Sequence, residues 1–128
     1  MKYIPLQVYV LFFLWGSDCP TGFVEVSETC YYKKHLDVLQ DFIDINTSLD
    51  GVPPQKIGYQ EWIDNRLTYL YLGDKNIVHI PDSIGLLKSL INLDLRNNQI
   101  VSLPEGICDI YPFYSDINLF GNQICPPY

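Results

Sequence analysis

Apolar positions recur at a fixed spacing through the C-terminal half of the chain. Two copies of one pattern begin at Leu67 and Leu90, 23 residues apart, and an incomplete third copy begins 24 residues later at Tyr114. A repeat of roughly 20 to 29 residues with this leucine spacing predicts a stacked solenoid, because no single copy can bury its own apolar face. The matching positions are Leu67, Leu70, Leu72, Ile77, Ile80, Pro81, Ile84 and Leu87 in the first copy, Leu90, Leu93, Leu95, Ile100, Leu103, Pro104, Ile107 and Ile110 in the second, and Tyr114, Ile117, Leu119, Asn122 and Ile124 in the third.

Within a copy, the pattern predicts a strand followed by a return path. In the first copy, Leu70 and Leu72 alternate with polar residues, which is typical of a strand with one buried side. Ile80-Pro81 begins the return path, and residues 83–90 predict a short helix on the convex side. The expected architecture is therefore α/β, with a parallel concave sheet and short convex helices or loops.

Asparagines follow the strand leucines at a constant offset. Asn98 and Asn122 each lie three residues after a strand leucine. A side-chain amide at this point can bond backbone groups of neighbouring turns that would otherwise be buried and unpaired. The first copy has Lys75 at the same offset, so we expect its part of this asparagine ladder to be imperfect.

A non-repeating segment precedes the first copy and predicts four elements. Strand-forming residues in 19–32 indicate a small hairpin, residues 47–58 are rich in turn formers, and residues 59–63 resemble a strand carrying Trp62. We expect that strand to run alongside the first repeat strand. Residues 35–46 predict a helix, with Leu36, Leu39, Phe42 and Ile43 on one side and Asp37, Gln40, Asp41 and Asp44 opposite.

The N-terminus has the features of a secretory signal peptide. Met1-Lys2 precedes an apolar run from Tyr3 to Trp15, and small residues Gly16-Ser17 follow it. The run is too short to span the roughly 30 Å of bilayer hydrocarbon, so no stable membrane insertion is expected. A buried N-terminal strand and a lipoprotein anchor at Cys19 are the alternatives.

Four cysteines in an exported chain indicate two disulfides, for which three pairings exist. The favoured pairs are Cys19–Cys30 and Cys108–Cys125, because each lies within one end of the molecule. Zinc binding is the weaker alternative, since the chain has no C-x-x-C pair.

Charge and motifs exclude several functions. The net charge of the 128 residues is −7, which argues against nucleic acid and anionic lipid as partners. No nucleophile elbow, phosphate loop or zinc-protease motif is present, so neither enzymatic activity nor a cofactor nor a metal is expected.

The two histidines, His35 and His79, are expected at the surface. Asn46-Thr47-Ser48 forms a glycosylation sequon.

The repeat resembles the 23-residue type of the leucine-rich-repeat family, here in a small secreted form. Residues 35–72 are similar to the N-terminal caps of secreted members, on the strength of Trp62 and the run Arg66-Leu67-Thr68-Tyr69-Leu70-Tyr71-Leu72. Asn122-Gln123-Ile124-Cys125 resembles the start of a disulfide-closed C-terminal cap. The resemblance implies a curved solenoid that binds proteins, peptides or glycans on its concave sheet, without catalysis.

These observations predict three regions and one candidate surface. The regions are a signal peptide (1–17), an N-terminal cap of hairpin, helix and Trp-bearing strand (18–66), and the repeats with a truncated C-terminal cap (67–128). The candidate ligand-binding residues alternate with the buried leucines: Tyr69, Tyr71, Asn92, Asp94, Arg96, Asp116, Asn118 and Phe120.

The predicted function is recognition of a protein, peptide or glycan partner by a secreted or cell-surface module, periplasmic in a Gram-negative source. The alternative is a structural or fragmentary element that stacks on further repeats or another chain and has no ligand of its own. An intracellular scaffold would require an uncleaved N-terminal run and reduced cysteines.

Overall fold

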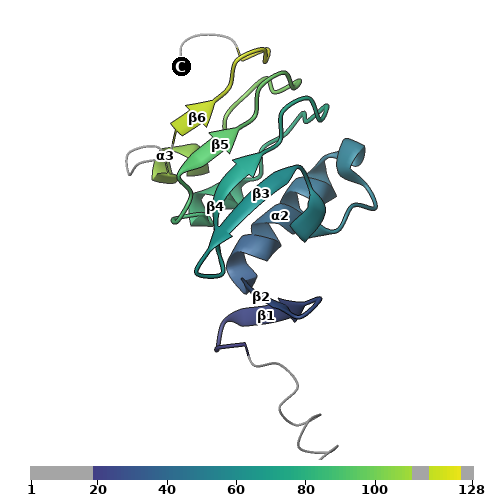
Figure 1. The fold of residues 1–128 in the computed structure, drawn as a ribbon. Coiled ribbons are helices and arrows are strands. Elements are labelled where there is room, and N and C mark those ends of the chain that lie inside the picture. The colour runs from purple at the N-terminus through teal and green to yellow at the C-terminus, as the bar shows by residue number, and fades with distance from the viewer. Residues whose placement is uncertain (1–18, 111–115, 125–128) are drawn as a thin grey trace, which may run out of the picture.

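The computed structural model describes residues 19–110 and 116–124, which form a small α/β domain with two sheets (Figure 1). The predicted signal peptide therefore lies outside the described residues, as do Tyr114 and Cys125. The elements in chain order are β1 (Phe23–Val26), β2 (Thr29–Tyr32), α2 (Lys33–Ile45), the 3₁₀ helices η1 (Thr47–Leu49) and η2 (Pro54–Lys56), β3 (Tyr59–Ile63), β4 (Arg66–Tyr71), the 3₁₀ helix η3 (Asp82–Leu86), β5 (Asn92–Asp94), α3 (Gly106–Ile110) and β6 (Asp116–Asn118).

The predicted leucine-rich-repeat solenoid is wrong. The chain forms a two-stranded sheet, β1-β2, and a four-stranded mixed sheet in the order β3-β4-β5-β6, in which β3 is antiparallel to β4. The single long helix among the described residues is α2, and the helix expected over 83–90 is the short 3₁₀ helix η3. The repeats supply only three parallel strands, and their apolar side is buried by α2 of the non-repeating segment together with the segments that connect the strands.

The C-terminal end also differs from the expected disulfide-closed cap. Cys108 is a free, exposed thiol on α3, so the predicted Cys108–Cys125 bond is not part of this structure. Cys19 and Cys30 do form a disulfide, with their Cα atoms 5.5 Å apart.

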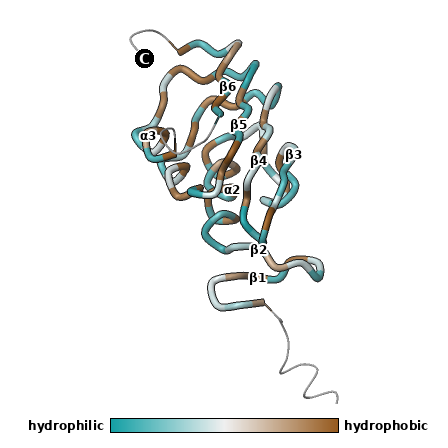
Figure 2. The backbone as a smooth tube through the Cα atoms, turned by 60° about the vertical axis from the view of Figure 1, so that its left-hand side comes forward, coloured by the Kyte–Doolittle hydropathy of each residue, from teal (hydrophilic) through white to brown (hydrophobic). Residues whose placement is uncertain are grey.

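One core joins the segment assigned to the cap with the repeats. The helix predicted over 35–46 is α2, and its apolar side packs against the strand leucines and the turns behind them. In Figure 2, hydrophobic residues drawn in brown recur along the four-stranded sheet. The core residues with almost no exposed surface include Val38, Leu39 and Phe42 of α2, Leu67, Leu70 and Leu72, Leu93 and Leu95, and Ile77, Ile84, Leu87 and Ile100 of the connecting segments.

Equivalent residues of successive copies lie opposite each other in neighbouring strands. In the parallel pair β4–β5, Leu70 lies opposite Leu93, and in β5–β6, Leu93 lies opposite Ile117. Because side chains alternate between the two faces of a strand, equal offsets bring equivalent residues to the same face. The leucines of successive strands therefore meet in one core, and the residues between them share the other face.

The strand expected over 59–63 is β3, and it pairs with β4, the first repeat strand, as predicted. Tyr59 lies opposite Tyr71 and Glu61 opposite Tyr69, before a bulge shifts the register. The extra residue is Thr68, whose hydroxyl donates a hydrogen bond of 3.0 Å to the carbonyl oxygen of Glu61. The regular pairing before the bulge places Glu61 and the three tyrosines on the same face of the sheet.

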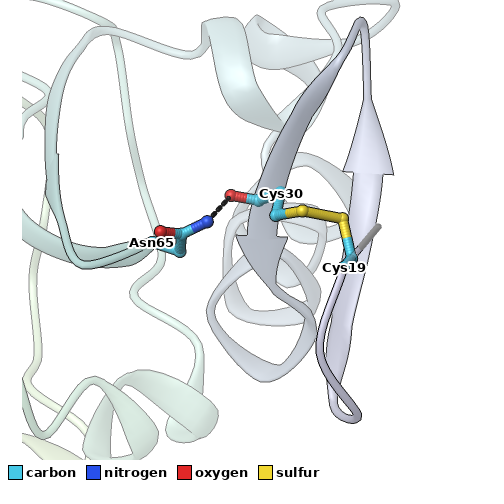
Figure 3. The surroundings of a disulfide bond; sticks show 3 residues. All are labelled: Cys19, Cys30 and Asn65. Carbon is cyan, nitrogen blue, oxygen red and sulfur yellow. Dashed lines mark hydrogen bonds between the residues drawn. A yellow bond between two sulfur atoms is a disulfide. The ribbon is translucent and has the colours of Figure 1, made fainter. Parts of the chain in front are cut away.

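The hairpin expected within 19–32 consists of β1 and β2 and extends beyond the four-stranded sheet in both views (Figures 1 and 2). Its turn residues Ser27 and Glu28 both have positive φ, as two-residue hairpin turns of type I′ require. Asn65 ties it to the β3–β4 turn: its Nδ2 donates to the carbonyl of Cys30 at 2.8 Å, next to the disulfide (Figure 3). The Arg66 guanidinium stacks 4.0 Å above the ring of Tyr32.

Buried asparagine amides hold the connecting segments in place. Asn98 accepts hydrogen bonds from the backbone N–H groups of Lys75 and Ile77 and donates to the carbonyls of Leu72 and Leu95. Asn122 accepts from Ile100 N–H and likewise donates to Leu95.

The first copy, which lacks an asparagine at this offset, has a third amide from a different element. Asn46, at the end of α2, accepts from the N–H groups of Val78 and His79 and donates to the carbonyl of His79. Its amide is buried and fully bonded, so the side chain of the sequon is not free to carry a glycan in this fold.

Candidate functional site: the open face of the four-stranded sheet

The face of the four-stranded sheet turned away from α2 carries two rows of polar and aromatic residues, here called the open face. Strand register places six of the eight predicted ligand-binding residues in these rows, and Arg96 and Phe120 each lie two residues after the end of β5 and β6, respectively. The structure adds two residues of β3 that the sequence did not identify, Tyr59 and Glu61. One row is Glu61, Tyr69, Asn92 and Asp116, and the other is Tyr59, Tyr71, Asp94 and Asn118.

Two aromatic residues on or beside the open face are unusually exposed. Tyr59 keeps 59% and Phe120 keeps 79% of its surface accessible, whereas Leu70 and Leu93, on the opposite side of the central strands β4 and β5, are buried. Large aromatic side chains are enriched in protein interfaces, where they supply contact area at low cost in conformational entropy. The two residues lie toward opposite edges of the sheet, so the exposed aromatic surface spans its width.

Four neighbouring residues of β3 and β4 form what we call the tyrosine–glutamate cluster: Tyr59, Glu61, Tyr69 and Tyr71. The Tyr59 hydroxyl donates a hydrogen bond of 3.0 Å to Glu61 Oε1. The ring centroids of Tyr59 and Tyr71 are 5.5 Å apart, and those of Tyr69 and Tyr71 are 6.3 Å apart with nearly parallel planes. The cluster therefore combines three aromatic rings with one carboxylate on a rigid sheet.

The surroundings of two of these phenols favour their neutral form. The hydrogen bond from Tyr59 to Glu61, and then the negative charge of Glu61, raise the pKa of Tyr59. Desolvation raises the pKa of Tyr71, and the charge of Glu61 adds to this. Because an unperturbed tyrosine titrates near pH ~10, both hydroxyls are protonated at neutral pH and can donate hydrogen bonds.

An ion pair fixes the arginine of the open face. Asp94 is only 4% exposed, and its Oδ2 lies 2.7 Å from the guanidinium of Arg96. Its other oxygen accepts a hydrogen bond of 3.0 Å from the backbone N–H of Arg96. The carboxylate is thus compensated on both oxygens, and the half-exposed guanidinium is held in one orientation with its remaining donors accessible.

An open hollow of about 500 Å³ adjoins the cluster at the ends of β4 and β5. Its wall contains two tyrosines of the cluster and the Asp94–Arg96 pair, so apolar and charged groups converge on one concavity, as in many ligand sites. The lining residues are Gly58, Tyr59, Tyr71, Gly73, Asp74, Lys75, Asp94, Arg96 and Asn97.

The expectation that His35 lies at the surface is wrong. Its side chain is 1% exposed, and its Nδ1 accepts a hydrogen bond of 3.0 Å from the backbone N–H of Leu67. Burial, with a smaller contribution from the charge of Arg66, lowers the pKa of His35 to about 4. The histidine therefore belongs to the packing between α2 and β4, whereas His79 is exposed as expected.

Residues 19–110 and 116–124 contain neither a metal centre nor a membrane span. No group of three or more His, Cys, Asp or Glu side chains among them is placed to hold a metal ion. Within the same residues, no helix is long and apolar enough to cross a membrane.

Comparisons with known proteins give no indication of what the open face binds. No protein-family model, no curated protein and no solved structure matches the chain.

Proposed function

We propose that this protein is a non-catalytic binding module that recognises a protein or peptide through the open face of its four-stranded sheet. One observation carries the proposal: strand register gathers three tyrosines, an oriented arginine and several carboxylates on one rigid face beside an open hollow. Tyrosine and arginine are the residues most often found among interface hot spots.

The proposal includes export from the cell. The described residues contain no membrane-spanning helix, and the Cys19–Cys30 disulfide is compatible with an extracellular location. The apolar N-terminal run supports secretion, and mass spectrometry of the native protein tests it. A mature N-terminus near residue 17 is expected, and an intact Met1 would contradict export by this route.

Kinship with leucine-rich-repeat proteins is part of the same proposal, limited to the repeated unit. It rests on the residues that recur at the 23-residue offset and on the matching register of β4 and β5. Recognition of partners by sheet-face residues is what that resemblance implies.

Site-directed changes on the open face test the binding function. Affinity capture with the full chain provides a candidate partner, whose Kd is then measured for Tyr71→Ala and Arg96→Ala. Each change is expected to weaken binding about tenfold or more, the usual effect of truncating an aromatic or arginine hot spot. Lys34→Ala is the matched control for the loss of a cation, because Lys34 is exposed on α2 behind the sheet.

If both variants bind as tightly as the natural protein, the open face is not the recognition surface. Thermal unfolding of each variant separates this outcome from loss of the fold, since a folded variant with unchanged affinity counts directly against the proposal.

A structural role is the second candidate, and a gradient of burial favours it. Leu93, Leu95 and Ile100 are fully buried, whereas the equivalent residues of the last copy, Ile117 and Leu119, are only half-buried. An apolar end of this kind is a surface on which another chain could stack. Sedimentation velocity over a wide concentration range decides: self-association that Ile117→Asp abolishes supports stacking, and a monomer throughout contradicts it.

A further inference from the structure

The carboxylate of Glu61 lacks a positively charged partner within the described part of the chain. The ion pairs formed there are Lys33–Asp37 and Asp94–Arg96. Glu61 Oε1 accepts the hydrogen bond from Tyr59, while Oε2 has no hydrogen-bond partner among the described residues. Glu61 is half-buried on a sheet face, so its charge is partly desolvated and an incoming cation would interact with it more strongly than in water.

The groups around this carboxylate are of a kind that favours cations. Tyr69 lies directly opposite Glu61, and Tyr71 lies opposite Tyr59, so three tyrosines share one face of the sheet with this negative charge. A guanidinium or ammonium group within about 6 Å of an aromatic centroid is attracted by the negative face of the ring. The same chain shows this contact internally, since the Arg66 guanidinium lies 4.0 Å from the ring centre of Tyr32.

The charge of the open face points in the same direction. Glu61, Asp94 and Asp116 oppose Arg96 alone, which gives −3 + 1 = −2 for the two rows together with Arg96. Asp94 is already paired with Arg96, so the uncompensated charge lies at Glu61 and Asp116. The whole chain carries −7, which steers basic segments toward it and repels acidic ones.

We propose that the tyrosine–glutamate cluster is a subsite for a basic side chain of the partner, an arginine guanidinium or a lysine ammonium group. The cation lies against the tyrosine rings and pairs with Glu61 Oε2, while the residues beside it in the partner reach the adjoining hollow. This inference rests on the proposed binding function and specifies the chemistry of the partner segment.

Titration of the full chain with short peptides tests the subsite directly, whichever partner the protein binds. The probes are acetyl-Gly-Arg-Gly-amide, acetyl-Gly-Lys-Gly-amide and, as a neutral isostere, acetyl-Gly-citrulline-Gly-amide. The two cationic peptides are expected to shift the NMR resonances of the Tyr59, Tyr69 and Tyr71 rings with millimolar affinity. The citrulline peptide should bind about fivefold more weakly, the factor that corresponds to a cation–π contribution of about 1 kcal/mol.

A charge-removing variant locates the effect. Glu61→Gln keeps an oxygen that can accept the Tyr59 hydrogen bond but removes the negative charge, and it should weaken binding of the arginine peptide by up to about fivefold, the factor that corresponds to an ion pair of about 1 kcal/mol. Glu25→Gln is the matched control: it makes the same charge-removing change at an exposed residue of β1, in the hairpin outside the open face, and should leave the affinity unchanged. The proposal is overturned if citrulline and arginine peptides bind equally, if Glu61→Gln has no effect, or if no peptide shifts the tyrosine resonances.

The outcomes for the subsite and for the proposed function are distinguishable. If Tyr71→Ala weakens binding of the captured partner but Glu61→Gln does not, the open face binds its partner and the subsite assignment fails. If the cationic peptides bind at the cluster but Tyr71→Ala leaves the affinity for the captured partner unchanged, the subsite exists and the proposed recognition surface fails.

Discussion

The half of the four-stranded sheet around β5, here called the repeated side, and the half around β3, here called the unique side, are stabilised in different ways. Around β5, the same kinds of contact occur in successive strands: an aliphatic side chain lies opposite another in the core, and an asparagine amide bonds to backbone groups of the neighbouring turn. Around β3, each contact occurs once, including the disulfide hairpin, the Arg66–Tyr32 stack and the buried His35. Equivalent contacts stabilise the strands that carry the repeat, whereas the end of the sheet formed by the non-repeating segment depends on contacts that each occur once.

The difference also separates stability from recognition. The repeated side supplies the core platform and six of the eight residues in the two rows of the open face, and the unique side contributes the other two, Tyr59 and Glu61, at its edge. When a surface is assembled from two different segments, substitutions in one segment can change what the surface recognises without altering the core beneath the other segment. Substitutions that affect one side more than the other can test this comparison.

The largest effect is expected at the start of β3, from Gly58→Ala. Gly58 has a positive φ of 58°, and a Cβ atom there would collide with the carbonyl oxygen of Tyr71. Relief requires β3 to move away from β4, so we expect the free energy of unfolding in urea to fall by about 3 to 4 kcal/mol. Gly51→Ala is the control: its φ is also positive, but open space surrounds it, so the loss should be only about 1 to 2 kcal/mol. Equal losses would contradict the close approach of the two strands.

A smaller effect is expected on the repeated side, from Asn98→Ala. The change leaves buried backbone groups of Ile77 and Leu72 without partners, and we expect a loss of about 3 kcal/mol in the free energy of unfolding. Asn122→Ala removes the equivalent amide at the less buried end of the sheet, where water can replace the lost bonds, so about 1 kcal/mol is expected. Chemical denaturation of both variants checks the order, and a larger loss for Asn122 would invert the comparison.

Acidification is expected to weaken the unique side through His35. Its pKa is about 4 in the folded protein against 6.5 as an unperturbed group, so both states are neutral above pH 6.5 and stability is then unaffected by this residue. Between pH 6.5 and 4 the unfolded chain binds a proton that the folded chain does not, and stability falls as the pH falls, by at most about 3 kcal/mol.

Equilibrium unfolding of His35→Gln and His79→Gln from pH 7.5 to 4 isolates this contribution. The first variant should lose the part of the pH dependence that lies between 6.5 and 4, whereas the second, which changes an exposed histidine, should keep it. The same pH dependence in His35→Gln and the natural protein would show that other groups cause it.

The smallest effect is expected at the surface of α2. Lys33 and Asp37 form an ion pair at 2.7 Å between side chains that are both more than half exposed. Solvent screening limits such helix pairs to about 0.3–0.5 kcal/mol. Lys33→Ala should therefore shift the midpoint of thermal unfolding by little, and a loss above about 1 kcal/mol would show that the pair also supports the adjacent hairpin.

Local patterns accounted for much of the fold. The helical spacing of Leu36, Leu39 and Phe42 corresponds to the buried side of α2, and the alternation around Leu70 and Leu93 corresponds to β4 and β5. These features depend only on the repeat distance of a helix or strand, which adjacent residues record. The conclusion drawn from them, a solenoid, failed because a recurring motif does not state how many strands share a core or what covers it.

Features that depend on distant segments were missed. His35 is separated by 32 residues from its hydrogen-bond partner Leu67, and Asn46 by 33 from His79. Neither residue stands out in the local pattern, since a histidine near the start of an amphipathic helix is as compatible with solvent as with burial. Tyr59 and Glu61 were overlooked as site residues because β3 lies outside the repeat.

The sequence by itself determined where α2 and the strands lie and which residues of β4, β5 and β6 share a face, because a strand alternates every two residues and successive copies are 23 and 24 residues apart. Only the tertiary structure decided that β3 adds to that face, that Glu61 meets three tyrosines and that Asp94 orients Arg96. Periodicity specifies which side of an element is buried, whereas the chemistry of a surface depends on which elements the packing of the whole chain brings together.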